Sequence, residues 1–249
     1  MGMRTFNFIT IFPDLINNFL KYGLVNRAIE KKIIEINTIY LRDFSDDSNL
    51  RIDDKSYGGG PGMVMRYKPV EDALKSITRK SYVIYLSPHG SKLDQHKISE
   101  LTKVQNLTFL CGRYEGYDQR VVDDLVDEQI SLGDYVISGG ELPSLILLEG
   151  ITRLLPNVAN DLDSILNDSF TDNLLDYPHY TRPESINGHE VPDVLLSGNH
   201  NEIAKWRRKQ SLGITWKNRP DLLKNVKLSI EDDKLLKEYI NESKENENK

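Results

Sequence analysis

Residues 130–145 read ISLGDYVISGGELPSL, and this stretch is the most informative in the chain. Gly133, Gly139 and Gly140 carry no Cβ, so the backbone there can adopt positive φ angles and a ligand can approach the main chain. Val136–Ile137 is too short for a core strand, and the residues after the glycines predict an apolar helix. We interpret the stretch as a loop whose backbone holds a ligand about as large as adenosine; the alternative is a tight turn before a helix. The GxGxxG and phosphate-loop motifs are absent, which disfavours a dinucleotide or a nucleoside triphosphate.

Two other segments carry glycines in a similar setting. Residues 53–63 read DDKSYGGGPGM, and residues 110–118 read LCGRYEGYD directly after the apolar run 107–110. In an open α/β sheet, ligands bind at the loops that follow the carboxyl ends of strands. A long flexible connection is the alternative for residues 53–63. Together with residues 130–145, these loops predict one ligand site.

The order of the apolar runs predicts an α/β fold. Runs of strand length occur at residues 6–12, 33–41, 82–86 and 107–110. Helical patterns alternate with them or follow them, at residues 15–31, 70–77, 97–104, 119–126 and 142–155. This alternation is typical of a parallel sheet covered by helices on both faces. On the last helix, a wide apolar stripe is formed by Leu142, Leu145, Leu148 and Ile151.

The remainder of the chain has a different composition. Residues 157–176 are rich in Asn, Asp and Ser without steady periodicity, which predicts a flexible linker. Beyond it, Ser197 is predicted to cap a helix that runs to Leu212, and shorter helices are expected at residues 221–225 and 231–241. We therefore predict three parts: an α/β domain over residues 1–156, a linker over 157–176 and a small all-α domain over 177–249.

Composition limits the class of protein. The 249 residues are 39% hydrophobic and 28% charged, as in a globular protein. Cys111 is the single cysteine, so no intrachain disulfide can form, and its apolar surroundings predict a buried thiol. No stretch approaches the roughly 20 apolar residues that span a bilayer, and the N-terminus lacks a secretion signal. A cytoplasmic protein without membrane contact is the expectation.

The net charge of −6 is unfavourable for nucleic-acid binding, but the charges are unevenly distributed. Acidic residues gather after residue 230, whereas Lys205-Trp206-Arg207-Arg208-Lys209 forms a basic cluster. A local basic patch can bind phosphates on an acidic protein. The alternative is a solvated helix face.

Seven motifs carry a resemblance to a known family. In chain order they are YGGGPGM (57–63), LSPHG (86–90), CGRYEG (111–116), GDYVISGGELP (133–143), DSF (168–170), HYTRP (179–183) and LLSGNH (195–200). Together they resemble the bacterial tRNA (guanine-N(1))-methyltransferases of the TrmD type, within the SPOUT class. The resemblance runs from about Phe6 to Leu223 and leaves the acidic C-terminal segment without a motif.

The resemblance implies a trefoil-knotted domain that binds S-adenosyl-L-methionine, the methyl donor. It further implies methylation of guanosine at position 37 of tRNA, next to the anticodon, which supports reading-frame maintenance. The partners it implies are tRNA with G at position 37 and a second copy of the chain, because in this family each active site is built from two subunits. It leaves Mg²⁺ open as an additional cofactor, while no metal ligands are predicted.

The chemistry of such a reaction requires two kinds of side chain. The N(1) atom of guanine carries a proton at neutral pH, so a base must remove it, and a cation must stabilise the charge that moves onto O6. By resemblance, Asp168 in the DSF motif is the general base and Arg153 lies over O6. For Asp168 taken by itself, a helix N-cap is the simpler interpretation.

The donor is expected among the glycine loops, where main-chain groups read the adenine edges and apolar side chains flank its ring. The predicted donor-binding residues are Tyr85, Leu86, Ser87, Pro88, Gly112, Arg113, Tyr114, Glu115, Ile130, Ser131, Leu132, Gly133, Asp134, Tyr135, Val136, Ile137, Gly139, Gly140 and Pro143. Glu115 is the candidate partner for the cationic end of the donor or for a metal. Replacement of Gly140 by Val is expected to abolish donor binding and leave the protein folded.

For tRNA, contacts to phosphates and stacking on bases are expected. The predicted tRNA-binding residues are Gly58, Gly59, His179, Arg182, Ser197, Asn199, His200, Arg207 and Arg208, with Lys209 beside them. Ser197 and Asn199 would meet a phosphate at a helix start. Trp206 is predicted to belong to the apolar face of its helix, with Ile203, rather than to stack on a base.

Three other functions compete with this interpretation. A methyltransferase of the same class acting on another RNA is disfavoured by the DSF and HYTRP motifs. A catalytically silent RNA-binding protein would be expected to lack Asp168 or Arg153. An oxidoreductase is the most remote alternative, and comparing the binding of S-adenosylhomocysteine with that of NAD would exclude it.

Overall fold

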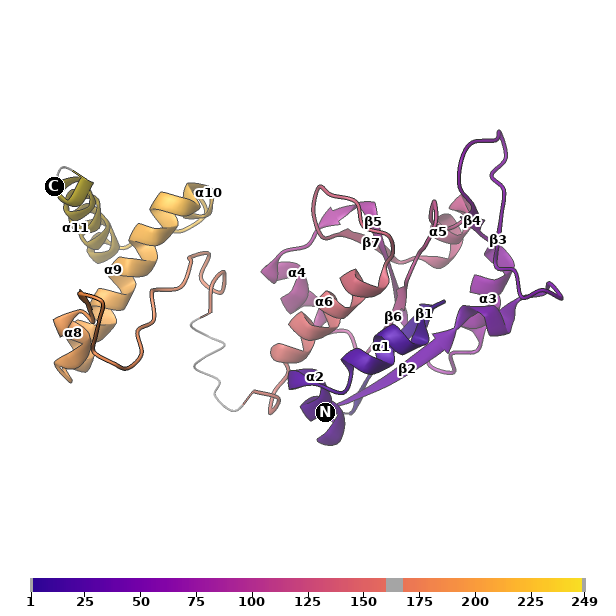
Figure 1. Ribbon diagram of the computed structural model, residues 1–249, viewed down its shortest axis with the longest axis horizontal. Helices are drawn as coiled ribbons and strands as arrows, with labels where there is room; N and C mark the ends of the chain where they lie inside the picture. Colours follow the sequence, from indigo (N-terminus) through magenta and orange to yellow (C-terminus); the bar gives the residue numbers. More distant parts are fainter. Residues whose placement is uncertain (1, 160–167, 248–249) are drawn as a thin grey trace. The chain divides into compact units, whose positions relative to one another are not determined.

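The computed structural model describes residues 2–159 and 168–247. It divides into two compact units, Met1–Asn160 and Asp161–Lys249, each of which is described by itself (Figure 1). Of the predicted linker, residues 160–167 lie outside the described residues. Leu174, also within it, is buried in the core of the second unit with Leu212 and Leu235, which the polar composition of the segment did not indicate.

The first unit is an α/β fold built on a five-stranded parallel sheet in the order β2-β1-β6-β5-β7. Its strands are β1 (Arg4–Thr10), β2 (Ile34–Tyr40), β5 (Tyr82–Lys92), β6 (Asn106–Leu110) and β7 (Glu128–Ser131). The strand β7 was not predicted, because its sequence EQIS contains no apolar run. A second, two-stranded sheet pairs β3 (Asp53–Asp54) with β4 (Val64–Met65).

Helices follow the strands, close to the predicted ranges. They are α1 (Pro13–Phe19), α2 (Gly23–Glu30), the 3-10 helix η1 (Leu41–Phe44), α3 (Tyr67–Lys75), α4 (Gln95–Leu101), α5 (Gln119–Leu125) and α6 (Glu141–Arg153). The single helix predicted over residues 15–31 was wrong. The chain forms two helices there, because Gly23 adopts a left-handed φ of 68° that interrupts the first.

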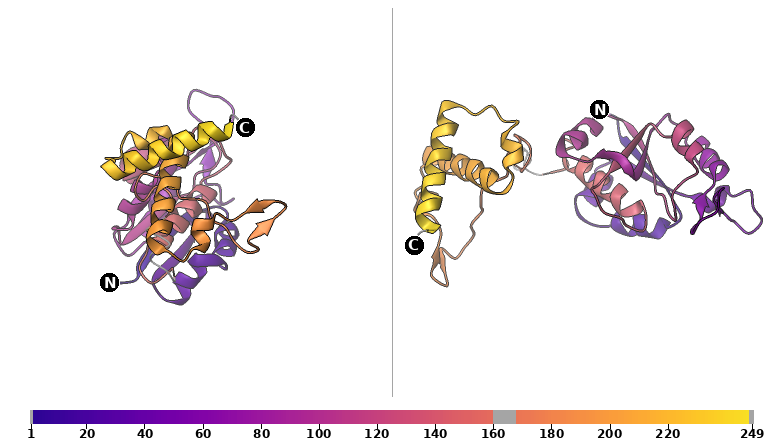
Figure 2. Two further views of the ribbon diagram at one scale, coloured as in Figure 1. Left: turned by 90° about the vertical axis from the view of Figure 1, so that its left-hand side faces the viewer. Right: turned by 90° about the horizontal axis from the view of Figure 1, so that it is seen from above.

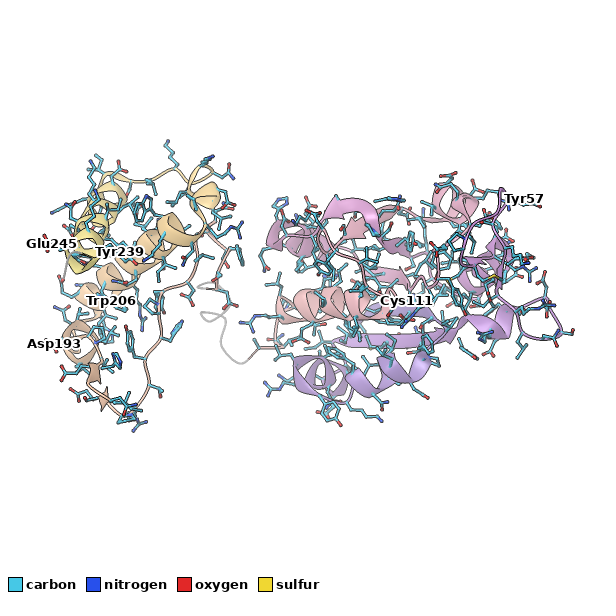
Figure 3. All side chains as sticks on the ribbon, turned by 45° about the horizontal axis from the view of Figure 1, so that its top comes forward. Tyr57, Cys111, Asp193, Trp206, Tyr239 and Glu245 are labelled. Atoms are coloured by element: carbon cyan, nitrogen blue, oxygen red, sulfur yellow. The ribbon has the colours of Figure 1, made fainter. Side chains whose placement is uncertain are left out.

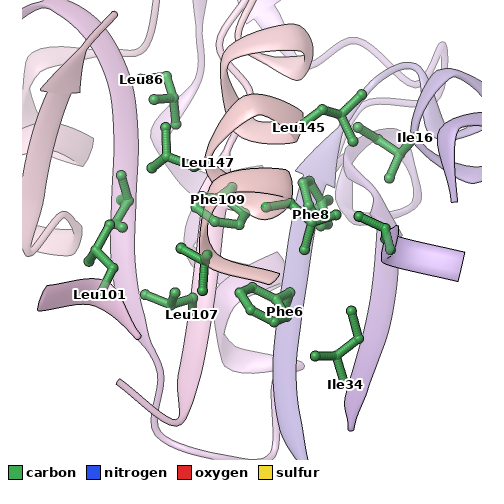
Figure 4. Packing of buried hydrophobic residues seen from close by; sticks show 14 of the residues in the cluster. Phe6, Phe8, Ile16, Ile34, Leu86, Leu101, Leu107, Phe109, Leu145 and Leu147 are labelled. Carbon is green, nitrogen blue, oxygen red and sulfur yellow. The ribbon is translucent and has the colours of Figure 1, made fainter. Parts of the chain in front are cut away.

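Side chains that alternate along the strands build two separate cores. Phe6 and Phe8 of β1 point to one face of the sheet, which α1, α2, α4 and α6 cover (Figure 4). Ile9 and Ile11 belong to the other core, beneath α3 and α5. Successive residues of a strand face opposite sides, so a strand buried on both faces reads as a continuous apolar run. This is why β1, β5 and β6 could be found from the sequence, whereas β7 could not.

The apolar stripe of α6 faces its own unit. Leu145, Leu148 and Ile151 are buried in the core beneath it. Leu142 and Ile146 are 58% and 50% exposed, one turn apart on the outer face. The exposed apolar surface of this helix therefore consists of a pair of side chains rather than of the predicted stripe.

The second unit contains α8 (Asp193–Leu196), α9 (His200–Asn218), α10 (Pro220–Leu223) and α11 (Ile230–Glu247). It also contains a hairpin of β8 (Ser185–Ile186) and β9 (His189–Glu190), so the prediction of a purely helical domain was wrong (Figure 2). Asn187 and Gly188 join the strands with φ angles of 52° and 78°. An Asn-Gly pair between strands is a strong hairpin signal, because both residues tolerate positive φ.

Two details of this unit differ from the sequence-based expectation. Asn199, rather than Ser197, caps α9, and its side chain accepts hydrogen bonds from the backbone of Asn201 and Glu202. The acidic C-terminal segment forms α11, an 18-residue helix that packs on α9, where Gly213 lies against the ring of Tyr239. Across residues 2–159 and 168–247, no helix is both long and apolar enough to cross a membrane.

Candidate active site

A cavity of about 390 Å³ lies where the loops after β6 and β7 meet the bulged end of β5. Because the strands are parallel, their carboxyl ends share one edge of the sheet, which is where open α/β sheets bind ligands. The bulge arises because both Leu86 and Ser91 pair with Ile130, so residues 87–90 leave the ladder, and Ser87, Pro88 and His89 line one wall. The volume lies within the range of small-molecule sites, roughly 300–1,000 Å³.

The structure brings together almost all of the side chains predicted to bind the donor. All of them except Asp134 line the cavity, and the Asp134 carboxylate lies outside it, 3.8 Å from Lys92 Nζ. Sequence reasoning missed several lining residues: His89, Gly116, Tyr117, Gln119, Val122, Gln129 and Ser138. Gly116 and Tyr117 belong to the glycine-bearing segment 110–118, whereas Gln129 belongs to the strand that was not predicted.

Tyrosines line the inner wall of the cavity. The rings of Tyr85 and Tyr117 meet edge to face, with centroids 5.2 Å apart. Burial raises the pKa of both hydroxyl groups, so both are neutral at physiological pH. Among the described residues, the buried Tyr117 hydroxyl has no hydrogen-bond partner. Leu86, Ile130 and Pro143 are also buried here, which gives the cavity the flat apolar walls that an adenine ring needs.

The glycines of the β7–α6 loop differ in backbone conformation and in what surrounds them. Only Gly133 adopts a positive φ, of 156°. Gly140 has an ordinary φ of −82°, and a Cβ there would lie 2.9 Å from Cys111 Cα. A Cβ on Gly139 would collide with the side chain of Arg113. Close packing against the β6–α5 loop therefore accounts for the absence of a side chain at Gly139 and Gly140, both of which also line the cavity.

This packing changes the expected result for Gly140→Val. The obstructing atoms are backbone, and the Gly140 amide donates to the Gly112 carbonyl at 2.9 Å, so neither segment can move aside freely. We expect a loss of about 1–3 kcal/mol in the free energy of unfolding, or more, along with loss of donor binding. Urea denaturation measures it, with Gly2→Ala as control, since a Cβ there would meet only Gln105 Nε2 at 3.7 Å. An unchanged unfolding midpoint would contradict the prediction.

Arg113 holds the loop in place instead of pointing its charge into the cavity. Its Nε and Nη2 atoms lie 2.9 and 2.8 Å from Glu141 Oε2, and its Nη1 donates to the Ser138 carbonyl at 3.2 Å. The other oxygen of Glu141 accepts from Thr10 Oγ1 at 2.8 Å. Glu141 is only 1% exposed, so this network joins β1, the β6–α5 loop and the first turn of α6 in the interior.

Cys111 lies at the base of these loops, fully buried, as its apolar surroundings predicted (Figure 3). Burial raises the pKa of the thiol, which keeps it protonated and unreactive. Within the described part of the chain, no group of three or more His, Cys, Asp or Glu side chains is arranged to hold a metal ion.

The two predicted catalytic residues belong to different units. Arg153 is the last residue of α6 in the first unit. Asp168 is in the second unit, where it lines a cavity of about 260 Å³ with Asp172, Asp176, Tyr177 and Arg207 among others. Each residue is therefore described in the surroundings of its own unit.

The predicted tRNA-binding residues are likewise spread over both units. Gly58 and Gly59 lie in the exposed β3–β4 loop, with φ angles of 84° and 79°, next to the fully exposed Tyr57 (Figure 3). His179 and Arg182 are exposed in the segment before the hairpin, and Nε2 of His179 lies 2.8 Å from Asp176 Oδ2. Ser197, Asn199 and His200 surround the start of α9.

The basic cluster on α9 is largely engaged within its own unit. Arg208 makes two hydrogen bonds to Asp232 at 2.7 and 3.1 Å, and these bonds lower the pKa of that carboxyl to about 2. Lys209 pairs with Glu242 at 2.8 Å and is itself only 17% exposed. Both acidic partners come from α11, so the C-terminal helix neutralises two of the charges assigned to RNA. Arg207 instead lies over the ring of Tyr177, 4.8 Å from its centroid.

Together, these features describe an α/β protein with a ligand cavity at the carboxyl edge of its parallel sheet and a separate, mainly helical unit. A family model described as tRNA (Guanine-1)-methyltransferase TrmD matches residues 3–225 of the 249. The chain belongs to this family, which confirms the resemblance inferred from the seven motifs.

Curated relatives are similar over nearly the full length. A tRNA (guanine-N(1)-)-methyltransferase of Aromatoleum aromaticum is 50% identical over 247 residues, covering 96% of this chain and 94% of the relative. Proteins with the same name from Vibrio vulnificus and Tolumonas auensis are 47% and 48% identical, each covering 94% of this chain and 96% of the relative. The similarity therefore includes both units and not only the α/β unit.

Proposed function

We propose that this protein transfers a methyl group from S-adenosyl-L-methionine to N(1) of guanosine at position 37 of tRNA. The product is 1-methylguanosine beside the anticodon, which supports maintenance of the reading frame. A tRNA substrate implies action in the cytoplasm. The observation that carries the proposal is the cavity formed by the β5 bulge and two glycine loops, in a chain whose relatives bear this activity in their names.

The cavity suits the donor in size and in chemistry. Its buried wall of Leu86, Ile130 and Pro143 would take the adenine ring, and loop main chain borders the ring edges. Glu115, an exposed residue of the lining, is our candidate partner for the cationic end of the donor or for Mg²⁺. When bound, the donor supplies an electrophilic methyl group on a sulfonium sulfur. Activity with and without EDTA tests whether Mg²⁺ is required.

The chain's own residues would supply the proton transfer and the charge stabilisation. We assign Asp168 as the base that accepts the N(1) proton of guanine, which frees the lone pair for attack on the methyl group. We assign Arg153 to the charge that develops on O6 at the same time. Holding the guanine ring and the methyl group in line is the task of the loops around the cavity.

We also propose that the first unit has the trefoil knot of the SPOUT class. The support is the close contact of the β7–α6 loop with the β6–α5 loop, where Gly140 N donates to the Gly112 carbonyl. A Cβ at Gly90 would likewise collide with the backbone of Gln129 and Ile130. Such tight crossings are what a chain threaded through its own loop requires.

A homodimer is the proposed active form, with each site built from both subunits, as membership of this family implies. Leu142 and Ile146 give α6 an exposed apolar pair that a second copy would cover. We expect a double change, Leu142→Glu and Ile146→Glu, to yield monomers without methyltransferase activity. Sedimentation at micromolar concentration measures it, with Glu149→Lys on the same helix as control. If the double variant remains dimeric, α6 does not form part of the interface.

Methyl transfer itself is tested with labelled donor. The expected result is incorporation into a tRNA with G at position 37 and none into the same tRNA with A at that position. Incorporation into ribosomal RNA instead would favour the alternative of a related enzyme that acts on another RNA. Binding of tRNA without any transfer would favour the catalytically silent protein.

A further inference from the structure

The second unit contains a cavity of its own, of about 440 Å³, between the segment before the hairpin and α9. Its lining combines aromatic and basic side chains with nearly as many aliphatic ones, and includes one carboxylate. The residues are Tyr177, Pro178, His179, Tyr180, Thr181, Arg182, Glu184, Val191, Leu195, Leu196, Ile203, Trp206 and Arg207. The sequence pattern assigned Trp206 to the apolar face of its helix, but it is only partly buried and stands outside the core cluster of this unit (Figure 3).

Aromatic rings from two segments meet in this cavity. The rings of Tyr180 and Trp206 lie 6.4 Å apart between centroids, and those of Tyr177 and His179 lie 4.7 Å apart. Tyr180 remains 50% exposed, so one of these rings keeps an accessible surface. Arg207 lies over Tyr177, and Arg182 is exposed at the other side of the lining. The cavity thus offers flat π surfaces bordered by guanidinium groups.

We propose that this cavity holds an unpaired base of the tRNA anticodon loop, stacked on Tyr180 and Trp206, with Arg207 and Arg182 on the flanking phosphates. The inference rests on the proposed function and adds a recognition site that is separate from the donor cavity. Bases splayed out of single-stranded loops are the part of an RNA that proteins recognise by stacking on aromatic rings. Each stacked base contributes to affinity whatever its identity, because every base has a π face.

The position of the cavity supports an anticodon-loop base. It shares Tyr177 and Arg207 with the smaller cavity that Asp168 lines, so the two adjoin within one unit. With the target guanosine at Asp168, a neighbouring loop nucleotide is therefore within reach of the aromatic cavity. Arg207, which borders both cavities, suits the phosphate between two such nucleotides.

Charge also distinguishes Arg207 from its neighbours. Arg208 and Lys209 are bound to Asp232 and Glu242, whereas the partner of Arg207 is an aromatic ring, which leaves its charge available to an anion. We therefore expect Arg207→Gln to lower the salt dependence of tRNA binding by about one counterion. Tyr180→Ala should leave that dependence unchanged, because stacking releases no counterion.

The chain has two tryptophans, Trp206 and Trp216, which makes the test direct. In Trp216→Phe, fluorescence reports on Trp206 alone, and in Trp206→Phe it reports on Trp216 alone. We expect a tRNA transcript to quench Trp206 strongly and Trp216 little, since Trp216 does not line the cavity. An RNA duplex of equal length without unpaired bases should bind through phosphates and leave Trp206 unquenched.

Affinity gives a second, independent measurement. Tyr180→Ala and Trp206→Ala should each weaken tRNA binding about 5- to 100-fold, the loss expected for one stacked base. Trp216→Ala, on the same helix, is the matched control and should change affinity little. Binding of S-adenosylhomocysteine and the thermal melt should be unchanged in all three variants, which separates lost stacking from lost folding.

Two outcomes would overturn the proposal. One is wild-type tRNA affinity in Tyr180→Ala with no quenching of Trp206, as expected if the cavity binds a protein segment instead. The other is equal quenching by the duplex. Failure of the proposed function looks different: the wild-type protein would then methylate no tRNA, while a single-stranded heptanucleotide would still quench Trp206. In a wild-type protein that does methylate tRNA, the first outcome also predicts normal methylation by Tyr180→Ala with an unchanged KM for tRNA, which contradicts the stacking site and leaves the proposed function intact.

Discussion

Asp168→Asn should slow methyl transfer by about 10²- to 10⁴-fold at saturating tRNA and donor, the range typical for loss of a general base. Asparagine keeps the size and the hydrogen-bonding reach of the side chain but cannot accept the N(1) proton of guanine. Both ligands should still bind with near-normal affinity. Single-turnover measurements separate the chemical step from binding and product release.

The cavity that Asp168 lines provides its own control. Asp172 belongs to the same lining and carries the same charge, so Asp172→Asn tests whether any carboxylate there matters. We expect that variant to retain most of its single-turnover rate. Arg153→Ala should be slow as well, because the charge that develops on O6 loses its cation. A near-normal rate in Asp168→Asn would reduce Asp168 to a structural role and require another proton acceptor.

Arg113→Met should lower the free energy of unfolding by about 3–5 kcal/mol, since it leaves a buried carboxylate without its cation. Glu141 is 1% exposed, and of its side-chain contacts with described residues it would keep the hydrogen bond from Thr10. Loss of the bond from Arg113 to the Ser138 carbonyl should also loosen the loop over the donor cavity. Urea denaturation and titration with S-adenosylhomocysteine measure the two effects.

Two further variants test whether the unpaired buried charge of Glu141 causes the loss of stability. Adding Glu141→Gln to Arg113→Met removes the unpaired charge and should restore a large part of the lost stability. Arg120→Met is the matched control, because Arg120 also pairs with a carboxylate, that of Asp118, but is 70% exposed. It should shift the unfolding midpoint little. Equal losses in Arg113→Met and Arg120→Met would show that burial of Glu141 is unimportant.

The donor cavity was predictable from the sequence because its components are local. The loops that form it follow β6 and β7, and the bulge belongs to β5; the glycine-bearing stretches 110–118 and 130–145 marked the two loops, although β7 itself was not predicted. A parallel sheet then brings the ends of its strands to one edge. Tyr117 and Gln129 were not predicted to line the cavity. Tyr117 resembles an ordinary aromatic residue of the core, and Gln129 belongs to the four-residue strand β7, which has no apolar run.

The purpose of individual side chains was less predictable. Arg113 and Gly140 were both assigned to the donor, and both line the cavity. Their main contacts are with Glu141 and with the backbone of Cys111, which are distant in sequence and close only in the folded unit. The sequence pattern cannot distinguish a glycine that makes room for a ligand from one that makes room for a neighbouring loop, because both positions simply lack a side chain.

The basic cluster on α9 shows where sequence information ends. The alternating strands and helices, the glycine loops, the family and the positive charges at residues 205–209 could be found without the fold, since each is set by neighbouring residues or by an ordered set of motifs. Which of these charges remain available depends on tertiary contacts: α11 packs on α9 and binds Arg208 and Lys209, while Tyr177 and Trp206 join Arg207 around a cavity. Whether a side chain keeps an available charge, and how deeply it is buried, depend on the partners that folding brings within a few ångströms. The partners here, Asp232 and Glu242, lie 24 residues from Arg208 and 33 residues from Lys209 in the sequence.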